Sequence, residues 1–258
     1  MSKSNIGVVI LAGAQAGQLF PQNSSISRGM VPVAGKPMVQ WVVDAFRGVP
    51  SVDRIVVVGD VDVVGADAVV PPCGGFVDNL RKGLECMEPD QKVILASCDI
   101  PMLTAESVED FIGRAREANA DFVYPIVPRS QCEAQYPGVK RTYLRTADGV
   151  FTGGNLVLVN PRFVLENWRI IREAYEARKH VLRLARIIGL SIVFRVLISM
   201  VCPRALKVSD LERAAARLLS GSVAAVVSEY PEIAEDVDKP SDLHAVERFL
   251  EKRVGNSK

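Results

Sequence analysis

The sequence lacks a dominant charge, and this absence excludes several kinds of partner. Its 31 lysine and arginine residues nearly cancel its 30 aspartate and glutamate residues. A chain with this balance has no global field that would attract DNA, RNA or an anionic membrane. We therefore expect a small-molecule partner, with no nucleic acid and no membrane.

Closely spaced cysteines and an apolar leader are also missing. The five cysteines stand at positions 73, 86, 98, 132 and 202. Their odd number and wide separation do not fit a structural zinc site or a redox pair. The first residues, MSKSNIG, contain no apolar signal region. These observations predict reduced thiols and a cytoplasmic protein. We expect a monomer or a homodimer.

No unbroken hydrophobic run is long enough to span a bilayer. The most apolar stretch, residues 181–202, is interrupted by Arg183, Arg186 and Arg195. Its uncharged runs fall short of the roughly 18 residues that a transmembrane helix needs. We predict a buried helix or helix pair here, and a surface-docking amphipathic segment is the alternative.

What the chain does have is a regular alternation of short apolar runs and helical segments. Residues 7–11, 54–59 and 92–97 are rich in β-branched side chains, which is typical of strands buried on both faces. Strands that alternate with helices predict a mostly parallel sheet covered by helices on both faces. A length of 258 residues and an apolar content of 48% fit one α/β domain over residues 1–258.

The second half departs from this alternation. Residues 142–152 predict an antiparallel hairpin with its turn at Asp148 and Gly149, so the sheet should be mixed. An irregular polar segment is expected before the hairpin. Residues 161–220 have a helical pattern and predict a lobe inserted beside the sheet.

The first strand runs into a loop that is suited to bind an anion. The loop contains the small residues Ala12, Gly13, Ala14, Ala16 and Gly17. Small side chains allow backbone N–H groups to approach a phosphate closely, although such turns are also common in α/β proteins without a site. After a polar loop come Arg28 and the sequence GKPM, in which Pro37 is expected to begin a helix.

Aspartates stand in two further segments, one directly after a predicted strand and one near the C-terminus. Asp99 follows a predicted strand, and ligands of open α/β sheets bind at the carboxyl ends of central strands. A simple cap or turn residue is the alternative. Near the C-terminus stand Asp236 and Asp238, where helix capping by Ser241 and Asp242 explains part of the pattern.

These motifs, in this order, resemble those of the MobA-like nucleotidyltransferases, which have a GT-A-like nucleotide-diphospho-sugar transferase fold. The resemblance rests on LAG with its loop, on the apolar pair and GKPM after Arg28, on the Asp-x-Pro at Asp99, and on the sequence DVDKPSDL that contains Asp238. It covers about residues 5–160 and 222–250.

The resemblance implies roles for individual residues. Nucleotide-binding residues would be Leu11, Ala12, Gly13, Ala14, Gly17, Gly74, Gly75 and Asn79, the last three at the base. Acceptor-binding residues would be Gly153, Gly154, Asn155 and Lys179. Catalytic residues would be Arg28, Asp99 and Asp238, with Mg²⁺ on Asp99 and Asp238 and with Asp236 as the alternative to Asp238.

Structural explanations remain open for several of these residues. Gly74 and Gly75 also fit an ordinary loop, and the glycines before Asn155 also fit a bend. Lys179 and Arg141 are candidate phosphate contacts, but basic residues at helix ends often only complement the helix dipole.

Two positions depart from the family pattern. Gln18 stands where the family has an arginine on the phosphates, and Arg28 stands where it has a lysine beside the transferred phosphoryl group. Arginine keeps the charge but presents a planar fork instead of a point charge.

The resemblance implies a Mg²⁺-dependent nucleotidyltransferase that moves a nucleoside monophosphate from an NTP to a phosphorylated small molecule and releases pyrophosphate. The alternatives are a nucleotide or nucleotide-sugar binding protein with weakened catalysis, which both departures would suit, and a glycosyltransferase on the same fold.

Overall fold

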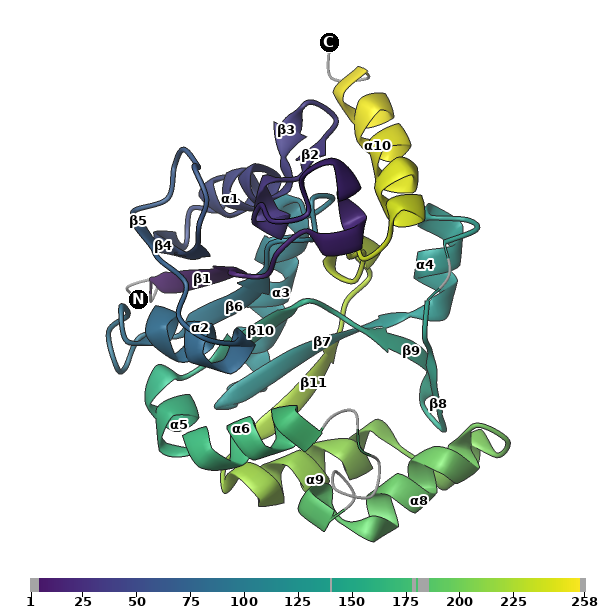
Figure 1. Cartoon of the computed structure of the whole chain (residues 1–258). Helices are drawn as coiled ribbons and strands as arrows, with labels where there is room; N and C mark the ends of the chain where they lie inside the picture. Colours follow the sequence, from purple (N-terminus) through teal and green to yellow (C-terminus); the bar gives the residue numbers. More distant parts are fainter. Residues whose placement is uncertain (1–4, 140, 178–179, 181–185, 256–258) are drawn as a thin grey trace.

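The computed structural model describes residues 5–139, 141–177, 180 and 186–255 (Figure 1). These residues form a mixed α/β structure in which a mostly parallel sheet lies between layers of helices, and this confirms the predicted fold class. Within this part of the chain the helices are all too short or too polar to cross a bilayer.

The sheet is built around β1 (Ile6–Ala12), which pairs in parallel with β4 (Val52–Gly59) on one side and β6 (Val93–Ser97) on the other. The strand order is β5-β4-β1-β6-β10-β7-β9-β8, and β11 pairs with the free side of β7. The remaining strands are β5 (Ala68–Val70), β7 (Phe122–Pro128), β8 (Leu144–Thr146), β9 (Gly149–Gly153), β10 (Leu156–Val159) and β11 (Val223–Val227). A two-stranded sheet is formed by β2 (Pro32–Val33) and β3 (Lys36–Pro37).

The antiparallel part of the sheet is made by β9 and β10, which both pair with β7. They are separated by Gly154 and Asn155, whose N–H groups bond to Pro125 O at 2.9 Å and to Ile233 O at 2.9 Å. The hairpin of β8 and β9 is present as predicted, but its turn consists of Ala147 and Asp148, because Gly149 already pairs with Thr146. The sheet is therefore mixed, as expected.

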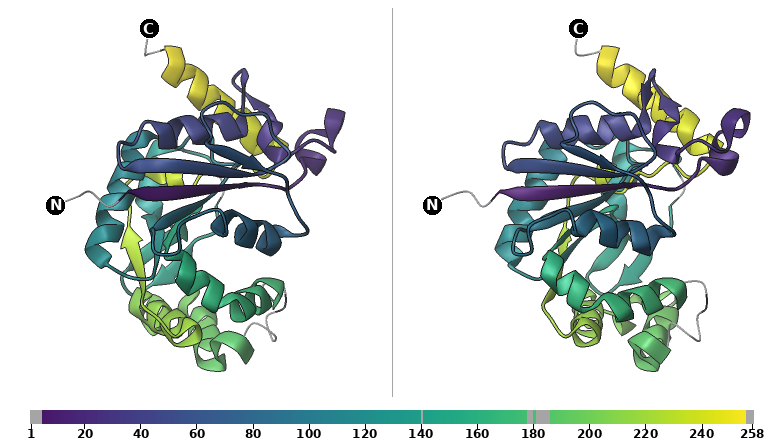
Figure 2. Two further views of the ribbon diagram at one scale, coloured as in Figure 1. Left: turned by 90° about the vertical axis from the view of Figure 1, so that its left-hand side faces the viewer. Right: turned by 60° about the vertical axis from the view of Figure 1, so that its left-hand side comes forward.

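Helices cover both faces because successive side chains of a strand point to opposite sides. Val8 and Ile10 of β1 pack in one core with α1 (Met38–Arg47) and α3 (Ala105–Ala118). Val9 packs in a second core with α2 (Phe76–Leu84) and α5 (Pro161–Glu166). In the edge-on view of Figure 2, α1 lies above the sheet and α2 below it.

The other helices lie at the periphery of the sheet. They are α4 (Arg129–Gln135), α6 (Trp168–Ala177), α8 (Leu190–Ser199), α9 (Val208–Leu219) and α10 (Pro240–Gly255), with 3₁₀ turns η1 (Gly17–Leu19), η2 (Pro21–Asn23), η3 (Arg28–Met30), η4 (Pro203–Ala205) and η5 (Pro231–Ile233). The prediction of an irregular segment before the hairpin was wrong, because α4 forms there with Cys132 buried. Pro37 caps α1 instead of beginning it, a difference of one residue.

A third core joins the two ends of the chain. Leu19 of η1 and Val33 of β2 pack with Val237 and with Val246 and Leu250 of α10. Figure 1 shows α10 beside the loops that follow β1. This packing fixes the segment before α10 against the segment after β1.

The close packing of α2 on the sheet gives a test of the fold. A Cβ atom at Gly83 would overlap with Val9 Cγ1 and lie 3.1 Å from Val58 Cγ2. We predict that Gly83→Ala lowers the free energy of unfolding by about 1–3 kcal/mol, because overpacking outweighs the better helix propensity of alanine.

Gly113 in α3 is the matched control, because nothing lies within 4 Å of a Cβ atom there. Gly113→Ala should raise the free energy of unfolding by about 0.5–1 kcal/mol. Urea unfolding measures both values. Stabilisation of equal size by both substitutions would show that α2 does not pack on the sheet as described.

Candidate active site

The carboxyl ends of β1 and β6 place two loops at the same edge of the sheet. Leu11 of β1 pairs with Ser97 of β6, so the small-residue loop and the turn that carries Asp99 are neighbours. Cys98 N donates to Leu11 O at 3.3 Å, which continues the contact beyond β6. Asp99 therefore lies where the sequence placed it, at the ligand-binding edge of an open α/β sheet.

Arg28 is held over this edge by the loop that follows β1. The backbone N–H of Arg28 donates to Ala14 O at 2.7 Å, and the hydroxyl of Ser27 donates to Ala12 O at 2.7 Å. Ser27 also caps η3 by accepting from Gly29 N at 3.3 Å. The sequence interpretation did not include Ser27, although a serine directly before a helical turn is a recognised N-cap signal.

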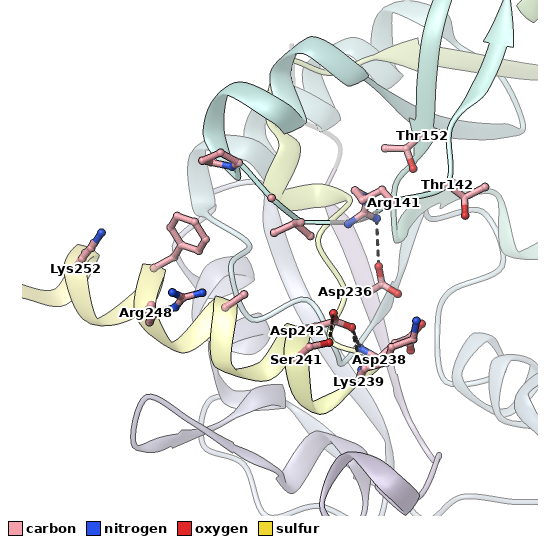
Figure 3. A pocket seen from close by; sticks show the side chains of 15 residues that line it. Arg141, Thr142, Thr152, Asp236, Asp238, Lys239, Ser241, Asp242, Arg248 and Lys252 are labelled. Atoms are coloured by element: carbon pink, nitrogen blue, oxygen red, sulfur yellow. Dashed lines mark hydrogen bonds and ion pairs between the residues drawn. The ribbon is translucent and has the colours of Figure 1, made fainter.

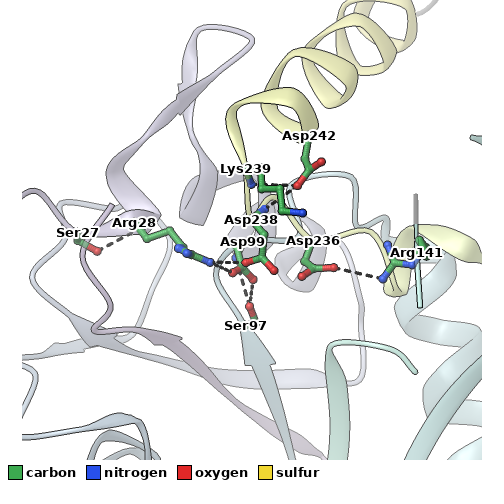
Figure 4. A network of polar contacts seen from close by, with 10 residues as sticks. Ser27, Arg28, Ser97, Asp99, Arg141, Asp236, Asp238, Lys239 and Asp242 are labelled. Carbon is green, nitrogen blue, oxygen red and sulfur yellow. Dashed lines mark hydrogen bonds and ion pairs between the residues drawn. The ribbon is translucent and has the colours of Figure 1, made fainter. Parts of the chain in front are cut away.

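One nitrogen of Arg28 contacts two carboxylates (Figure 4). Its Nη1 lies 2.9 Å from Asp99 Oδ2 and 2.8 Å from Asp238 Oδ1. The other oxygen of Asp99 accepts from the hydroxyl of Ser97. The three residues predicted to be catalytic thus lie in direct contact, and they come from segments up to 210 positions apart.

The backbone fixes the C-terminal acids relative to Asp99. Val237 N donates to Asp99 O at 2.9 Å, and the Val237 side chain is fully buried in the third core. Asp236 and Asp238, on either side of Val237, contact different arginines. Asp238 pairs with Arg28, whereas Asp236 pairs with Arg141 at 3.2 Å.

Burial controls the protonation of the acids in this cluster. Desolvation raises the pKa of Asp99 above its ordinary value, although the hydrogen bond and charge of Arg28 oppose this. For Arg28, burial lowers the pKa, but its bonds to Asp99 and Asp238 raise the pKa more, so it stays charged. Desolvation raises the pKa of Asp236 to about 6. The charge of Arg141 opposes this increase, whereas the negative charges of Asp238 and Asp99 add to it.

A second buried ion pair lies beside the first. Arg141 contacts Glu235 Oε2 at 3.1 Å as well as Asp236, and its side chain is only 10% exposed. The Nε atoms of Arg28 and Arg141 are buried and have no hydrogen-bond partner in the described part of the chain. Buried N–H donors without acceptors are expensive, so these two atoms are donors that the described protein groups leave available.

The donor atoms at this edge fit a magnesium ion that is completed by substrate. Asp99 and Asp238 offer hard carboxylate oxygens that both reach a single point, which is filled here by Arg28 Nη1. The described residues contain no group of three His, Cys, Asp or Glu side chains arranged to hold a metal. Mg²⁺ does not require such a cage, because it usually binds one or two carboxylates together with waters and phosphates.

The glycines of the predicted nucleotide loop have structural reasons to be glycine. Gly17 has a φ of +56°, which disfavours other residues, and it begins η1. A Cβ atom at Gly13 would overlap with the amide of Asn79. Leu11, Ala12 and Ala14 line the same edge of the sheet, at the end of β1 and directly after it. Gln18, at the first departure from the family pattern, is exposed in η1.

The second predicted nucleotide segment is tied to the first by Asn79. Its side chain is buried, and its Oδ1 accepts from Cys73 N at 2.6 Å. Gly74 has a φ of +60°, and Gly75 N donates to Asp78 Oδ2 at 3.1 Å at the start of α2. Asn79 therefore positions the glycine loop near Gly13, and its contact with a base stays a prediction.

The predicted acceptor residues lie where β9 meets β10. Gly153 packs against Tyr124, and Gly154 packs against Ile233 so closely that a Cβ atom would overlap with either neighbour. The O atom of Asn155 accepts from Ser97 N at 3.3 Å, next to the turn that carries Asp99. Lys179 lies outside the described residues.

A cleft of about 860 Å³ opens beside the acids (Figure 3). One wall contains Arg141, Thr142 and Thr152, and the other is the α10 side with Arg248 and Lys252. Asp236 and Asp238 lie at its inner end, as Figure 3 shows. Sequence reasoning missed the two α10 cations, whose spacing of four residues was the signal that they share one helix face.

Comparison with known proteins agrees with this geometry. The model of the MobA-like NTP transferase domain matches residues 8–187. The chain belongs to this family. A solved structure from Thermus thermophilus, described as a hypothetical transferase, superposes with a TM-score of 0.82 at 34% identity, over 93% of this chain and 99% of that one.

The curated relatives match less than half of this chain. The molybdenum cofactor guanylyltransferase of Yersinia pestis is 25% identical over 46% of this chain and 61% of its own length. The bifunctional protein GlmU of Paramagnetospirillum magneticum is 29% identical over 45% of this chain. The chain spans only 27% of that GlmU protein.

The raised pKa of Asp236 predicts how stability depends on pH. A folded-state pKa of about 6, above the ordinary 3.8, means that the folded protein holds this proton more tightly than the unfolded chain does. The contribution of Asp236 to the free energy of unfolding should therefore fall as pH rises from about 4 to about 6. In Asp236→Asn the slope of the unfolding free energy against pH should be more positive than in the wild type, by the equivalent of up to about one bound proton.

Chemical denaturation at several pH values between 4 and 7 measures this slope. Asp62→Asn is the control, because Asp62 is exposed and makes no ion pair among the described residues. Its slope should equal that of the wild type. An unchanged slope in Asp236→Asn would contradict the raised pKa.

Proposed function

We propose that this protein is a Mg²⁺-dependent nucleotidyltransferase that transfers a nucleoside monophosphate from an NTP to a phosphorylated small molecule and releases pyrophosphate. The observation that carries this proposal is the convergence of Asp99 and Asp238 on one nitrogen of Arg28, between the loop after β1 and the cleft beside α10. Membership of the family supports the use of an NTP. We place the activity in the cytoplasm, where NTPs are available.

The loop after β1 would bind the nucleotide. Backbone N–H groups of residues 12–17 would face its phosphates, and Gly74, Gly75 and Asn79 would lie near its base. The unpartnered Nε–H of Arg28 would donate to a phosphate oxygen. Bound between Asp99 and Asp238, Mg²⁺ would supply positive charge against which anionic phosphates can approach one another.

The acceptor would bind in the cleft and attack the nucleotide directly. Arg248 and Lys252 on the α10 wall of the cleft offer positive charges to a phosphorylated molecule, and Gly153, Gly154 and Asn155 lie at the adjoining end of the sheet. A phosphate oxygen of the acceptor would form a bond to the α-phosphorus as the bond to pyrophosphate breaks. Arg28 would stabilise the negative charge that develops around the α-phosphorus. Holding the acceptor phosphate and the NTP in line would supply the rest of the rate enhancement.

A nucleotide-binding protein with weakened catalysis is the second candidate. The observation that favours it is the same Arg28 nitrogen, which occupies the point where a cation would bridge the two carboxylates. Because a guanidinium cannot lose its proton, metal would have to displace it. Release of pyrophosphate on mixing with an NTP and phosphorylated acceptors distinguishes a transferase from a binding protein.

Calorimetric titration with each of the four NTPs tests the proposed site. We expect tight binding of one NTP in the presence of Mg²⁺ and at least about tenfold weaker binding without it. Asp99→Asn should remove the effect of Mg²⁺, because the substitution deletes a metal-binding charge but keeps the shape of the side chain.

Asp62→Asn is again the matched control and should bind like the wild type. If no NTP binds, or if binding depends on neither Mg²⁺ nor Asp99, the proposal is wrong. Binding that meets both conditions without any pyrophosphate release would favour the second candidate.

Arg28→Ala tests the competition between Arg28 and metal. Without Mg²⁺ the substitution should lower the free energy of unfolding by about 1–3 kcal/mol, because Asp99 is left buried without its positive partner. Millimolar Mg²⁺ should restore more stability in this variant than in the wild type, since metal can then bind between the carboxylates without displacing a guanidinium. Thermal unfolding with and without Mg²⁺ measures both effects.

Arg28→Lys is the control, because it keeps the charge and restores the residue found in the family. It should lose less stability than Arg28→Ala. If Mg²⁺ raises the melting temperature of Arg28→Ala and of the wild type equally, Arg28 and the metal do not compete for the same position.

A further inference from the structure

Helix α8 is apolar on all sides although it lies on the surface. Its ten residues, LSIVFRVLIS, contain one charged side chain. Helices of this kind are normally enclosed by protein or lipid. In Figures 1 and 2, α8 lies at the end of the molecule opposite α10, next to β8 and α9.

One face of α8 is covered by the protein itself. Ile192 is buried, and Val193 and Val196 pack with Leu206 and with Ala214 of α9 in a small core. Ser199 is fully buried and donates its hydroxyl hydrogen to Val196 O at 2.8 Å. This inward face attaches α8 to α9 and to Leu206.

The opposite face has no partner in the described part of the chain. Leu190, Phe194 and Leu197 are 73%, 64% and 55% exposed, and Val201 just beyond the helix is 90% exposed. Six of the ten large hydrophobic side chains that the structure describes as exposed lie within residues 190–201. We call the set Leu190, Phe194, Leu197, Ile198, Met200 and Val201 the α8 outer face. Such a concentration marks an interaction surface, whereas single exposed hydrophobic residues are ordinary.

Basic residues predominate in the part of the sequence that contains α8. Residues 177–209 contain seven lysine or arginine residues and no aspartate or glutamate. Of these, Arg186, Arg204 and Lys207 are exposed and form no ion pair with any described residue. Arg195 pairs with Asp210 at 3.1 Å, so its charge is partly compensated.

This combination of apolar and basic residues identifies the occupant. A two-fold contact between two copies would place the same patch against itself and bring like charges together. An anionic lipid surface satisfies both features, because acyl chains accept the apolar face while lipid phosphates attract the flanking arginines. At ten residues α8 is too short to span a bilayer, so it would lie in the plane of the interface.

We propose that the α8 outer face docks this protein on anionic lipid surfaces. Phe194 and Leu197 insert below the headgroups, and Arg186 and Arg204 contact the lipid phosphates. The balanced charge of the whole chain does not oppose this docking, because Arg186, Arg204 and Lys207 are exposed close to α8 in the sequence and form no ion pair with any described residue. The docking is independent of the nucleotidyl transfer, since no α8 residue lines the cleft.

Vesicle co-sedimentation tests the proposal. The full chain is mixed with vesicles of equimolar phosphatidylglycerol and phosphatidylcholine, and in parallel with vesicles of phosphatidylcholine alone. We expect the protein to sediment with the anionic vesicles and to remain in solution with the neutral ones. Raising the salt concentration to about 0.5 M should weaken the binding, because it screens the arginines.

Two kinds of variant separate the apolar and the basic contributions. Phe194→Asn with Leu197→Asn should lower the vesicle partition coefficient about tenfold or more. Arg186→Glu with Arg204→Glu should lower it on anionic vesicles only. Val64→Asn is the matched control, because Val64 is 79% exposed elsewhere on the surface, and it should bind like the wild type.

Circular dichroism and the melting temperature establish that the variants fold, which is expected because every substituted side chain is exposed. The proposal is overturned if the wild type ignores anionic vesicles or if Phe194→Asn with Leu197→Asn binds them unchanged. It is also overturned if sedimentation velocity shows dimers that this double variant dissociates while no vesicle binding occurs, because the α8 outer face is then an interface between copies.

Discussion

The contact of Arg28 with Asp99 and Asp238 is the interaction on which the candidate site depends. It joins the loop after β1, the turn after β6 and the segment before α10 at a single guanidinium nitrogen. Without a positive group between them, two carboxylates held so close would repel each other. A positive group at this position, such as the guanidinium of Arg28, relieves that repulsion.

The apolar core beneath this contact makes the arrangement specific. Val237 is buried between the two acids that flank it, and its N–H bonds to Asp99 O. Burial of Val237 leaves the flanking Asp236 and Asp238 at the cleft, where Asp236 contacts Arg141 and Asp238 contacts Arg28. Packing of α10 on the loop after β1 then holds both acids at the edge of the sheet.

The two ends of the molecule use charge in different ways. At the edge of the sheet, arginines and aspartates are paired and mostly buried, so burial raises the pKa of Asp99 and Asp236. Around α8, basic residues lie in solvent beside an exposed apolar face. The near-zero net charge of the chain conceals this difference, because composition averages over distances that electrostatic interactions do not cross.

Hydrophobic periodicity and short motifs are local properties, so the sequence alone predicted the alternation of strands and helices and the mixed sheet. The resemblance to the family selected Arg28, Asp99 and Asp238, whose catalytic roles stay a prediction. The sequence did not predict α4, the role of Ser27, or the cations of α10 that face the cleft. Only the tertiary structure decided that Asp238 and not Asp236 contacts Arg28, and that one face of α8 stays uncovered. These outcomes depend on packing between segments up to 210 residues apart, which no local pattern encodes.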